Sequence, residues 1–250
     1  MTYCLAIALD EGLVFASDSR THASPDQVST NSKMHCFGTA GQRQLVLLCA
    51  GNLATTQAVV GRLQKDISHS AVINMNTVDD LAAAADYLGE VYLQVQEQYG
   101  DSEAANFILG GQIAGQPPAA MLVYPQGNHI TTGADTPYLQ IGESKYGKPV
   151  LDRFLDLSTG LDHAARCALI SLDSTMRSNV SVGEPIEVLL YETNSLCLQH
   201  RVKLDEDSNY LREVRRQWDR KLREGLQSLQ PLPMQPLADP LDNSSELPPT

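Results

Sequence analysis

The order of strand-like and helix-like segments constrains the fold of this 250-residue chain more than any other feature. Short apolar segments come first, and two longer segments with apolar residues at helical spacing follow them. The same order, strands and then helices, occurs a second time. A further hairpin and a charged helix end the pattern. Runs of strands followed by runs of helices are typical of α+β folds with antiparallel sheets.

The first half of the pattern covers residues 2–98. There we predict strands at 2–9, 13–20, 33–37 and 44–50, and helices at 53–67 and 77–98. Residues 21–31 form a polar connection. Asn52 is the predicted N-cap of the first helix and Thr77 that of the second. In the second half we predict strands at 105–113, 119–125, 128–132, 186–192 and 195–202, and helices at 146–156, 160–177 and 206–228. The strands are apolar on both faces, as inner layers are. The sequence therefore predicts a four-layer α/β/β/α sandwich of two antiparallel sheets flanked by helix pairs.

The composition does not change before residue 230, and 42% of the residues are hydrophobic, which is enough for one sizeable core. We therefore expect a single domain over 1–230. The segment 231–250 is rich in Pro, Asp, Asn and Ser, and such a composition predicts a disordered tail.

Charge and cysteine usage exclude several classes of function. The formal net charge is -12, which argues against a nucleic-acid or anionic-membrane surface because both attract clustered Lys and Arg. No stretch approaches the roughly 18 apolar residues of a membrane helix, and no basic, apolar leader precedes the first strand. The five cysteines form no CxxC or Cys/His cluster, so neither a disulfide framework nor a zinc site is indicated. We expect a cytoplasmic protein.

The first two predicted strands form a hairpin around residues 10–12, in which Gly12 supplies the positive φ. With a three-residue loop, Cys4 lies opposite Asp18, and Thr2 shares their face because side chains alternate along a strand. Thr2 and Asp18 are then diagonal neighbours, roughly 7–8 Å apart at the backbone. A two-residue loop would turn Asp18 to the other face, so this placement depends on the turn.

Four residues of the first half suit one chemistry. If Met1 is removed, Thr2 carries both a hydroxyl nucleophile and a free α-amine, whose ordinary pKa of roughly 7.7–8.0 suits a base near neutrality. The ammonium of Lys33 would lower the pKa of that amine, and Asp18 would keep the lysine charged. Gly51 ends a strand where its backbone N–H is a candidate donor to an oxyanion.

These residues lie in segments that resemble the N-terminal-nucleophile threonine peptidases of the proteasome β-subunit superfamily, most closely its bacterial Anbu (ancestral β-subunit) branch. The segments are Thr2, Phe15 to Thr21, Ser32 to His35 and Cys49 to Gly51. The likeness covers about 1–225. It implies the Ntn-hydrolase α/β/β/α fold, an amide-hydrolysing threonine, and assembly into rings or open-ring spirals. No metal or organic cofactor is needed. Peptides or unfolded proteins are the implied substrates, and an ATPase is a partner by analogy only.

Carried over by position, Thr2 is the nucleophile and, through its amine, the base. Asp18 and Lys33 are the charged pair, and the Gly51 amide is the oxyanion donor. The same resemblance assigns the border of the pocket for the substrate side chain to Thr21, His22 and Cys49.

The chain departs from the family pattern in its second half. An acid-x-x-Ser-Gly segment supports the N-terminal amine in the family, whereas this chain reads Ser178 to Gly183 there. Asn179 or Ser178 replaces the acid, depending on the alignment, and Ser181 is the candidate hydroxyl. The mid-chain serine of the family maps onto Ser144. We expect Asn179 and Ser181 in the site.

Two other functions fit the same residues. One is a non-catalytic structural subunit that keeps the fold and assembles, with Asp18 and Lys33 as an inert ion pair. The other is an N-terminal-nucleophile amidase for a small amide metabolite. The charged helix at 206–228 is either a solvated face or, in an oligomer, a subunit contact.

Overall fold

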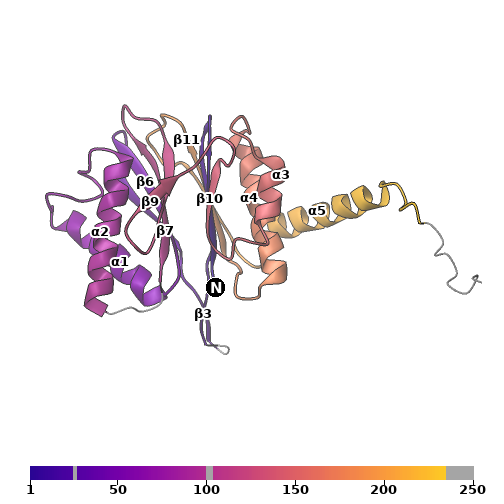
Figure 1. Ribbon diagram of the computed structural model, residues 1–250, viewed down its shortest axis with the longest axis horizontal. Coiled ribbons are helices and arrows are strands. Elements are labelled where there is room, and N and C mark those ends of the chain that lie inside the picture. The colour runs from indigo at the N-terminus through magenta and orange to yellow at the C-terminus, as the bar shows by residue number, and fades with distance from the viewer. Residues whose placement is uncertain (25–26, 100–103, 235–250) are drawn as a thin grey trace, which may run out of the picture. The chain divides into compact units, whose positions relative to one another are not determined.

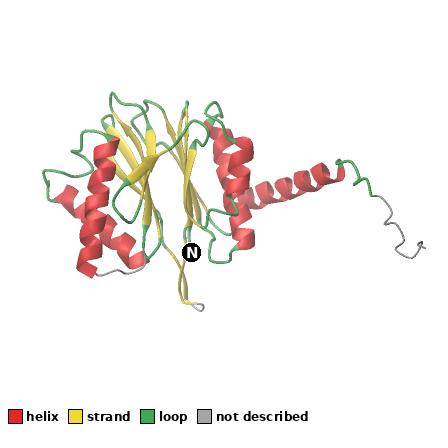
Figure 2. Cartoon of the chain, in the orientation of Figure 1, coloured by secondary structure: helices red, strands yellow, loops and turns green. Residues whose placement is uncertain are grey.

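The computed structural model describes residues 1–24, 27–99 and 104–234, and for residues 22–28 it describes no side chains. The chain divides into two compact units, residues 1–215 and 216–250. In the first unit, two five-stranded antiparallel sheets pack face to face, and helices cover their outer faces (Figures 1 and 2). The predicted four-layer sandwich is thus confirmed. The predicted disorder of 231–250 falls mainly on residues outside the described part of the chain.

The first sheet has the strand order β10-β1-β2-β11-β12. Its strands are β1 (Tyr3–Leu9), β2 (Gly12–Asp18), β10 (Tyr138–Gly142), β11 (Ile186–Glu192) and β12 (His200–Leu204). Helices α3 (Lys148–Phe154) and α4 (Leu161–Ser178) lie on its outer side. Side chains of β1 alternate between the two layers: Leu5 packs in the core beneath α4, while Cys4 packs in the core between the sheets.

The second sheet has the strand order β5-β6-β7-β8-β9. Its strands are β5 (Met34–Thr39), β6 (Arg43–Ala50), β7 (Asn106–Ile113), β8 (Ala119–Val123) and β9 (His129–Thr131), and helices α1 (Leu53–Ser68) and α2 (Leu81–Tyr99) cover it. Between the sheets, the ring of Phe15 meets Gly110, where an added Cβ would lie 2.8 Å from the ring. Glycine on β7 therefore lets the two sheets approach closely.

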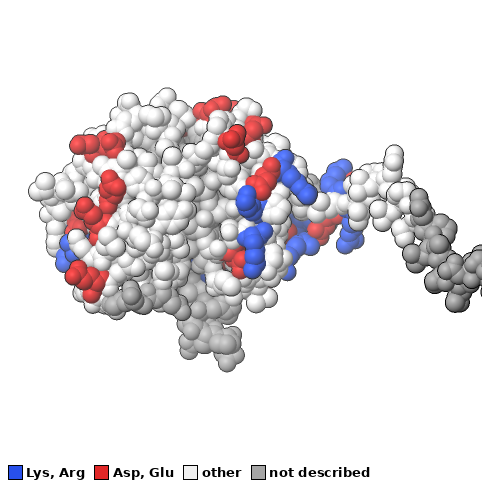
Figure 3. All heavy atoms as spheres, viewed as in Figure 1, with Lys and Arg blue, Asp and Glu red and all other residues white. Residues whose placement is uncertain are grey.

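The last helix, α5 (Asn209–Gln227), crosses from the first unit into the second. Its first turns are fastened to the sandwich by Leu211, which is buried, and by Arg215. The Arg215 guanidinium donates to Asp173 at 2.5 Å and to Glu184 at 2.7 Å. No helix of the described residues is both long and apolar enough to cross a bilayer. On the face that Figure 3 shows, the left of the view carries mostly acidic side chains, and most basic side chains lie toward the right, among acidic ones.

The register of the first hairpin differs from the prediction. Leu9 pairs with Gly12 and Cys4 pairs with Ser17, so the loop has two residues, Asp10 and Glu11. The expected pairing of Cys4 with Asp18 is wrong. Gly12 belongs to the strand because it also pairs with Glu192 of β11, and an added Cβ there would lie 2.0 Å from the Tyr191 oxygen. Its φ of +149° therefore serves this close approach instead of the turn.

Three strands were not predicted. The predicted polar connection 21–31 contains all but the first residue of β3 (Arg20–Ser24) and the whole of β4 (Gln27–Thr30), which form a separate two-stranded sheet. Their β-branched residues, Thr21, Val28 and Thr30, favour strands although the stretch is polar overall. Strand β10 was missed because it is a short edge strand in a stretch rich in turn residues. Its pairing with β1 fixes where the chain begins to fold into the sheet.

The two largest errors in the predicted boundaries, at the starts of α2 and β12, have local causes. Helix α2 begins at Leu81, not after Thr77, because Asp80 is the cap: its Oδ1 accepts the Ala83 N–H at 2.7 Å. Strand β12 begins at His200, since Asn194 and Leu196 adopt positive φ and interrupt the extended chain. The predicted cap of α1 is confirmed, with Asn52 Oδ1 accepting the Thr55 N–H at 3.1 Å.

Candidate active site

Thr2 is held at the end of the first sheet by strand β10. The side chain of Met1 is 69% exposed, whereas Thr2 is 9% exposed. The Thr2 carbonyl accepts the backbone N–H of Glu143 at 2.7 Å. Gly142 has a φ of +83°, and a Cβ there would lie 1.9 Å from the Thr2 oxygen. Only glycine permits this turn, which fixes Thr2 against the sheet.

Asp18 lies beside Thr2, although not through the predicted register. It lies one position beyond the last β1–β2 pair, Cys4 with Ser17, so the observed register places it opposite Tyr3, the residue after Thr2. Its Oδ1 accepts the Tyr3 backbone N–H at 3.0 Å, and its Oδ2 accepts the Gly183 N–H at 3.2 Å. The carboxylate of Asp18 is fully buried. It therefore contacts the residue directly after Thr2.

Lys33 connects the two sheets at this point. It precedes β5 of the second sheet, is 8% exposed, and donates from Nζ to Asp18 Oδ1 at 2.6 Å and to the Arg20 carbonyl at 2.7 Å. Burial raises the pKa of the Asp18 carboxyl, and the Lys33 ammonium and two backbone N–H groups oppose that rise. A buried ion pair is tolerated only with such additional hydrogen bonds. The arrangement fixes a lysine ammonium next to the start of the chain.

Gly51 directly follows β6 and has a φ of +118°. A Cβ at this position would lie 2.5 Å from the Ala104 oxygen and 2.7 Å from the Ala105 Cα, so no larger residue fits. Asn52 then caps α1, which turns the chain away from the sheet. The strand end and the helix start thus come together beside Thr2, as the sequence predicts. The part of the Gly51 amide as an oxyanion donor stays a prediction.

A cavity of about 970 Å³ lies beside Thr2. Thr2, Lys33 and Gly51 line it together, and α1 forms one wall. Cys49 also lines it; burial raises the pKa of its thiol, so it is a neutral, small wall residue. Thr21 lines it too, and its hydroxyl is buried without a hydrogen-bond partner in the described part of the chain. His22, predicted at the pocket border, has a side chain outside the described residues.

The segment Ser178 to Gly183 contacts the residues around Thr2 through Glu143. Asn179 ends α4, and its Nδ2 donates to Glu143 Oε2 at 2.9 Å, while its Oδ1 accepts the Ser181 N–H at 3.0 Å. Neither Asn179 nor Ser181 is among the residues that line the cavity. Ser144, the candidate mid-chain serine, donates its N–H to the Gly142 carbonyl at 3.0 Å and so belongs to the turn beside Thr2.

Two residues that the sequence did not single out take part here. Gly183 donates its N–H to Asp18, and Glu143 binds both Thr2 and Asn179. Glu143 was not visible as a site residue because β10 itself was missed. Its only sequence signal is an acid directly after the glycine that ends an apolar run.

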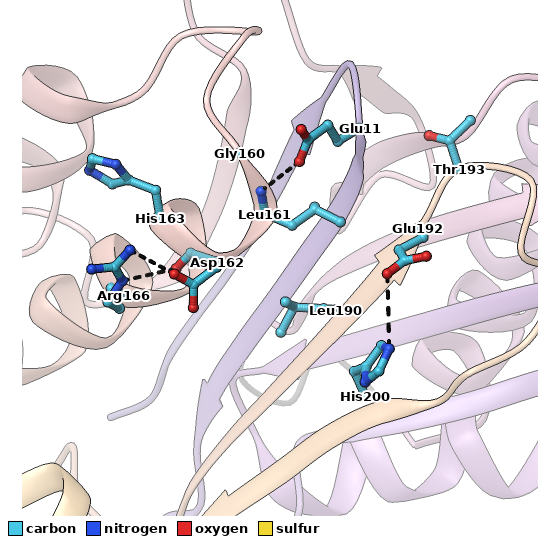
Figure 4. Close-up of a pocket in the computed structure, with 10 residues that line it drawn as sticks. All are labelled: Glu11, Gly160, Leu161, Asp162, His163, Arg166, Leu190, Glu192, Thr193 and His200. Atoms are coloured by element: carbon cyan, nitrogen blue, oxygen red, sulfur yellow. Dashed lines mark hydrogen bonds and ion pairs between the residues drawn. The ribbon is translucent and has the colours of Figure 1, made fainter.

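A second cavity of about 770 Å³ lies at the opposite end of the first hairpin (Figure 4). There Glu11 Oε2 accepts the Leu161 N–H at 3.1 Å and so caps α4. Asp162 pairs with Arg166 one turn further along the same helix, at 2.6 Å. These charged groups serve a helix end and a surface ion pair. The cavity at Thr2 is therefore the candidate active site.

The chain is similar to several solved structures over nearly its whole length. Anbu (ancestral beta-subunit) from Yersinia bercovieri is 44% identical with a TM-score of 0.90, covering 93% of this chain and 100% of that one. The helical assembly of the Anbu complex from Pseudomonas aeruginosa is 46% identical with a TM-score of 0.88, covering 92% and 98%. An Anbu (Gly-1) mutant from Hyphomicrobium sp. strain MC1 is 38% identical with a TM-score of 0.90, covering 94% and 100%. No family model and no curated protein matches the chain.

Proposed function

The chain belongs to the Anbu (ancestral beta-subunit) family, a proteasome-related branch of the N-terminal-nucleophile hydrolases, and on this premise we propose that it is a threonine peptidase. It hydrolyses peptide bonds through Thr2 once Met1 has been removed. One observation supports this most strongly: the Asp18 carboxylate holds the Lys33 ammonium at 2.6 Å and the backbone N–H next to Thr2 at 3.0 Å. The nucleophile and its charged neighbour are thereby fixed together beside a cavity.

In the proposed reaction, the α-amine of Thr2 takes the proton of its own hydroxyl while Oγ forms a bond to the substrate carbonyl carbon. The carbonyl oxygen becomes an oxyanion, and the Gly51 N–H donates to it. When this intermediate collapses, the C–N bond breaks and the leaving amine takes the proton from the Thr2 ammonium. An ester on Thr2 remains. Water, deprotonated by the same amine, then attacks the ester and releases Thr2.

Lys33 acts on this chemistry through its charge. A nearby cation lowers the pKa of an amine, so the Thr2 amine is unprotonated, and therefore able to act as a base, at neutral pH. Asp18 and the Arg20 carbonyl hold the Lys33 ammonium in one place, so its field does not have to be reorganised during the reaction. Asp18 is thus a positioning residue for the lysine.

The cavity supports a peptide substrate. At about 970 Å³ it is large enough for a side chain and part of the backbone of an extended peptide. Cys49 and Thr21 present small groups to it, and we propose that they, with His22, border the pocket for the substrate side chain. We further propose that the chain assembles with copies of itself into a ring or open-ring spiral, in keeping with the helical assembly described for the Pseudomonas aeruginosa relative.

We propose that the enzyme acts in the cytoplasm. All five cysteines are free thiols, which suits a reducing compartment. An ATPase that feeds unfolded chains to the assembly is a partner by analogy only.

A peptide-library cleavage assay on protein shown by intact mass to start at Thr2 tests the proposal. We expect cleavage by this protein and none by Thr2→Ala. Equal cleavage by both proteins would contradict the assignment. Correctly processed protein that cleaves no peptide would point to a structural subunit instead, a function that the absence of the family acid from the segment Ser178 to Gly183 favours. Cleavage of small amides alone would point to an amidase.

A further inference from the structure

A buried carboxylate that the proposed mechanism does not use lies next to Thr2. Glu143 is 7% exposed and follows β10 directly. Its backbone N–H donates to the Thr2 carbonyl at 2.7 Å, so the two residues are adjacent across the end of the β1–β10 pair. The turn at Gly142 allows this approach and admits no other residue. The position of Glu143 relative to Thr2 is therefore set by the backbone.

Asn179 holds the Glu143 side chain in a defined orientation. The Ser181 backbone N–H can only donate, so the Asn179 atom that faces it at 3.0 Å is the amide oxygen. The amide nitrogen must then point the other way, and it donates to Glu143 Oε2 at 2.9 Å. The Asn179 backbone is fixed as well, since its N–H donates to the Thr175 carbonyl at the end of α4. Asn179 thus donates to a carboxylate from a fixed position at the end of α4.

Among the described residues, the Glu143 carboxylate contacts no buried cation. Its nearest cation is Lys145, whose Nζ lies 3.5 Å from Oε1 and whose side chain is 66% exposed to solvent. Asn179 contributes a neutral hydrogen bond only. A buried carboxylate with this little compensation is costly, because isolated charges lose their hydration on burial. A further positive group at this position would offset that cost.

We propose that Glu143 is a positioning residue that faces the free α-amine of Thr2 and that Asn179 holds it there, an inference that rests on the proposed function. Glu143 and Asn179 together then perform the task that one acidic residue on the late segment performs in the family pattern.

The charges around the Thr2 amine act in opposite directions. The ammonium of Lys33 lowers the pKa of the amine, whereas Glu143 raises it by favouring the ammonium form. Asp18 is engaged by Lys33, the Arg20 guanidinium pairs with Glu184 at 3.5 Å, and Lys145 is solvated beside Glu143. The balance of Lys33 and Glu143 therefore leaves the amine basic enough to accept the Thr2 hydroxyl proton.

The test measures the titration of the Thr2 amine itself, in full-length protein prepared to start at Thr2. The rate of acetylation of the amine by trace acetic anhydride, followed against pH by mass spectrometry, gives its pKa without any need for turnover. In Glu143→Gln we expect this pKa to fall by about one unit. The acidic limb of kcat/KM moves down with it, and the plateau falls on the order of tenfold. Glu11→Gln, which removes one carboxylate at the far end of the first hairpin, is the matched control and leaves both unchanged.

Two further variants separate charge from packing. In the double variant Glu143→Gln/Asn179→Asp, the exchange variant, the carboxylate and the amide change places. We expect it to restore the pKa of the Thr2 amine and most of the kcat/KM. Asn179→Ala keeps the Glu143 charge but removes the hydrogen bond that orients its carboxylate, so the pKa of the Thr2 amine falls less than in Glu143→Gln. An unchanged amine pKa in both Glu143→Gln and Asn179→Ala overturns the proposal, as does an exchange variant that restores nothing. If instead the pKa shifts as expected but wild-type protein hydrolyses no peptide, the proposed function fails and the placement of Glu143 stands.

Discussion

At each end of the first hairpin, an acidic side chain accepts a backbone N–H, but the surroundings of the two carboxylates differ. At one end Glu11 accepts the Leu161 N–H at 3.1 Å, and at the other Asp18 accepts the Tyr3 N–H at 3.0 Å. Glu11 is exposed and caps a helix, whereas Asp18 is fully buried and also binds Lys33. Geometry alone therefore does not make a site. Burial and the paired lysine distinguish the candidate site from the other end of the hairpin, because low-dielectric surroundings strengthen the field that a lysine exerts on its neighbours.

Removing the lysine charge is expected to give the largest effect of any change at either end. Lys33→Met leaves Asp18 buried without its cation, so we expect kcat/KM to fall at least about 100-fold and stability to fall by about 3–5 kcal/mol. The double variant Lys33→Met/Asp18→Asn removes both charges and should recover most of the stability, measured by chemical denaturation, but none of the activity. Recovery of activity in the double variant would show that the pair is only structural.

The backbone beside the site is the next most sensitive feature. Gly51→Ala places a Cβ 2.5 Å from the Ala104 oxygen at a φ of +118°, so we expect a loss of more than about 1 kcal/mol and a lower kcat. Gly61→Ala in α1 is the matched control, since a Cβ there meets nothing within 4 Å. It should raise stability by roughly 0.5–1 kcal/mol, as alanine does in a helix. Equal melting temperatures for the two variants would argue against the strained turn.

At the far end of the hairpin the expected effect is smaller and confined to stability. Glu11→Ala removes the cap of α4 and should cost about 1 kcal/mol, seen as a lower melting temperature. The kcat/KM for peptides should stay at the wild-type value, because the Glu11 end holds no part of the proposed site. A substantial fall in kcat/KM at unchanged fold would mean that the two ends are coupled.

The smallest predicted effect is a dependence of stability on pH. Burial raises the pKa of Glu184, but hydrogen bonds from its own backbone and from Arg215, with the charge of Arg20, outweigh this and leave the pKa below its ordinary value. The folded state therefore binds this proton less tightly than the unfolded state. The resulting stability is present above the ordinary glutamate pKa of about 4.3 and is lost as the pH falls below it. Glu184→Gln should weaken the acid dependence of unfolding between about pH 5 and 3.

The sequence predicted strands and helices well where their apolar pattern is regular. Strand β11 was predicted at Ile186–Glu192 and occurs there, and α4 differs by one residue at each end. The position of Asp18 near Thr2 was predicted through a register that is wrong by one residue. Asp18 still contacts the start of the chain, since the observed register places it opposite Tyr3, whose backbone N–H it accepts.

Other features depend on contacts that no local pattern encodes. Strand β10 is an edge strand defined by its pairing with β1, and the place of Glu143 follows from that pairing. Asn179 was predicted in the site, but the structure places its amide on Glu143 and outside the residues that line the cavity. Both depend on residues more than 30 positions apart in the chain.

The most direct test is the intact mass of the protein, prepared to start at Thr2, after reaction with a peptide epoxyketone. Such a reagent forms a stable ring only with a hydroxyl and an amine on the same residue. We predict one adduct per chain, mapped to Thr2, and none on Thr2→Ala that still folds. The same adduct on Thr2→Ala, or no adduct on the wild-type protein, would contradict the account.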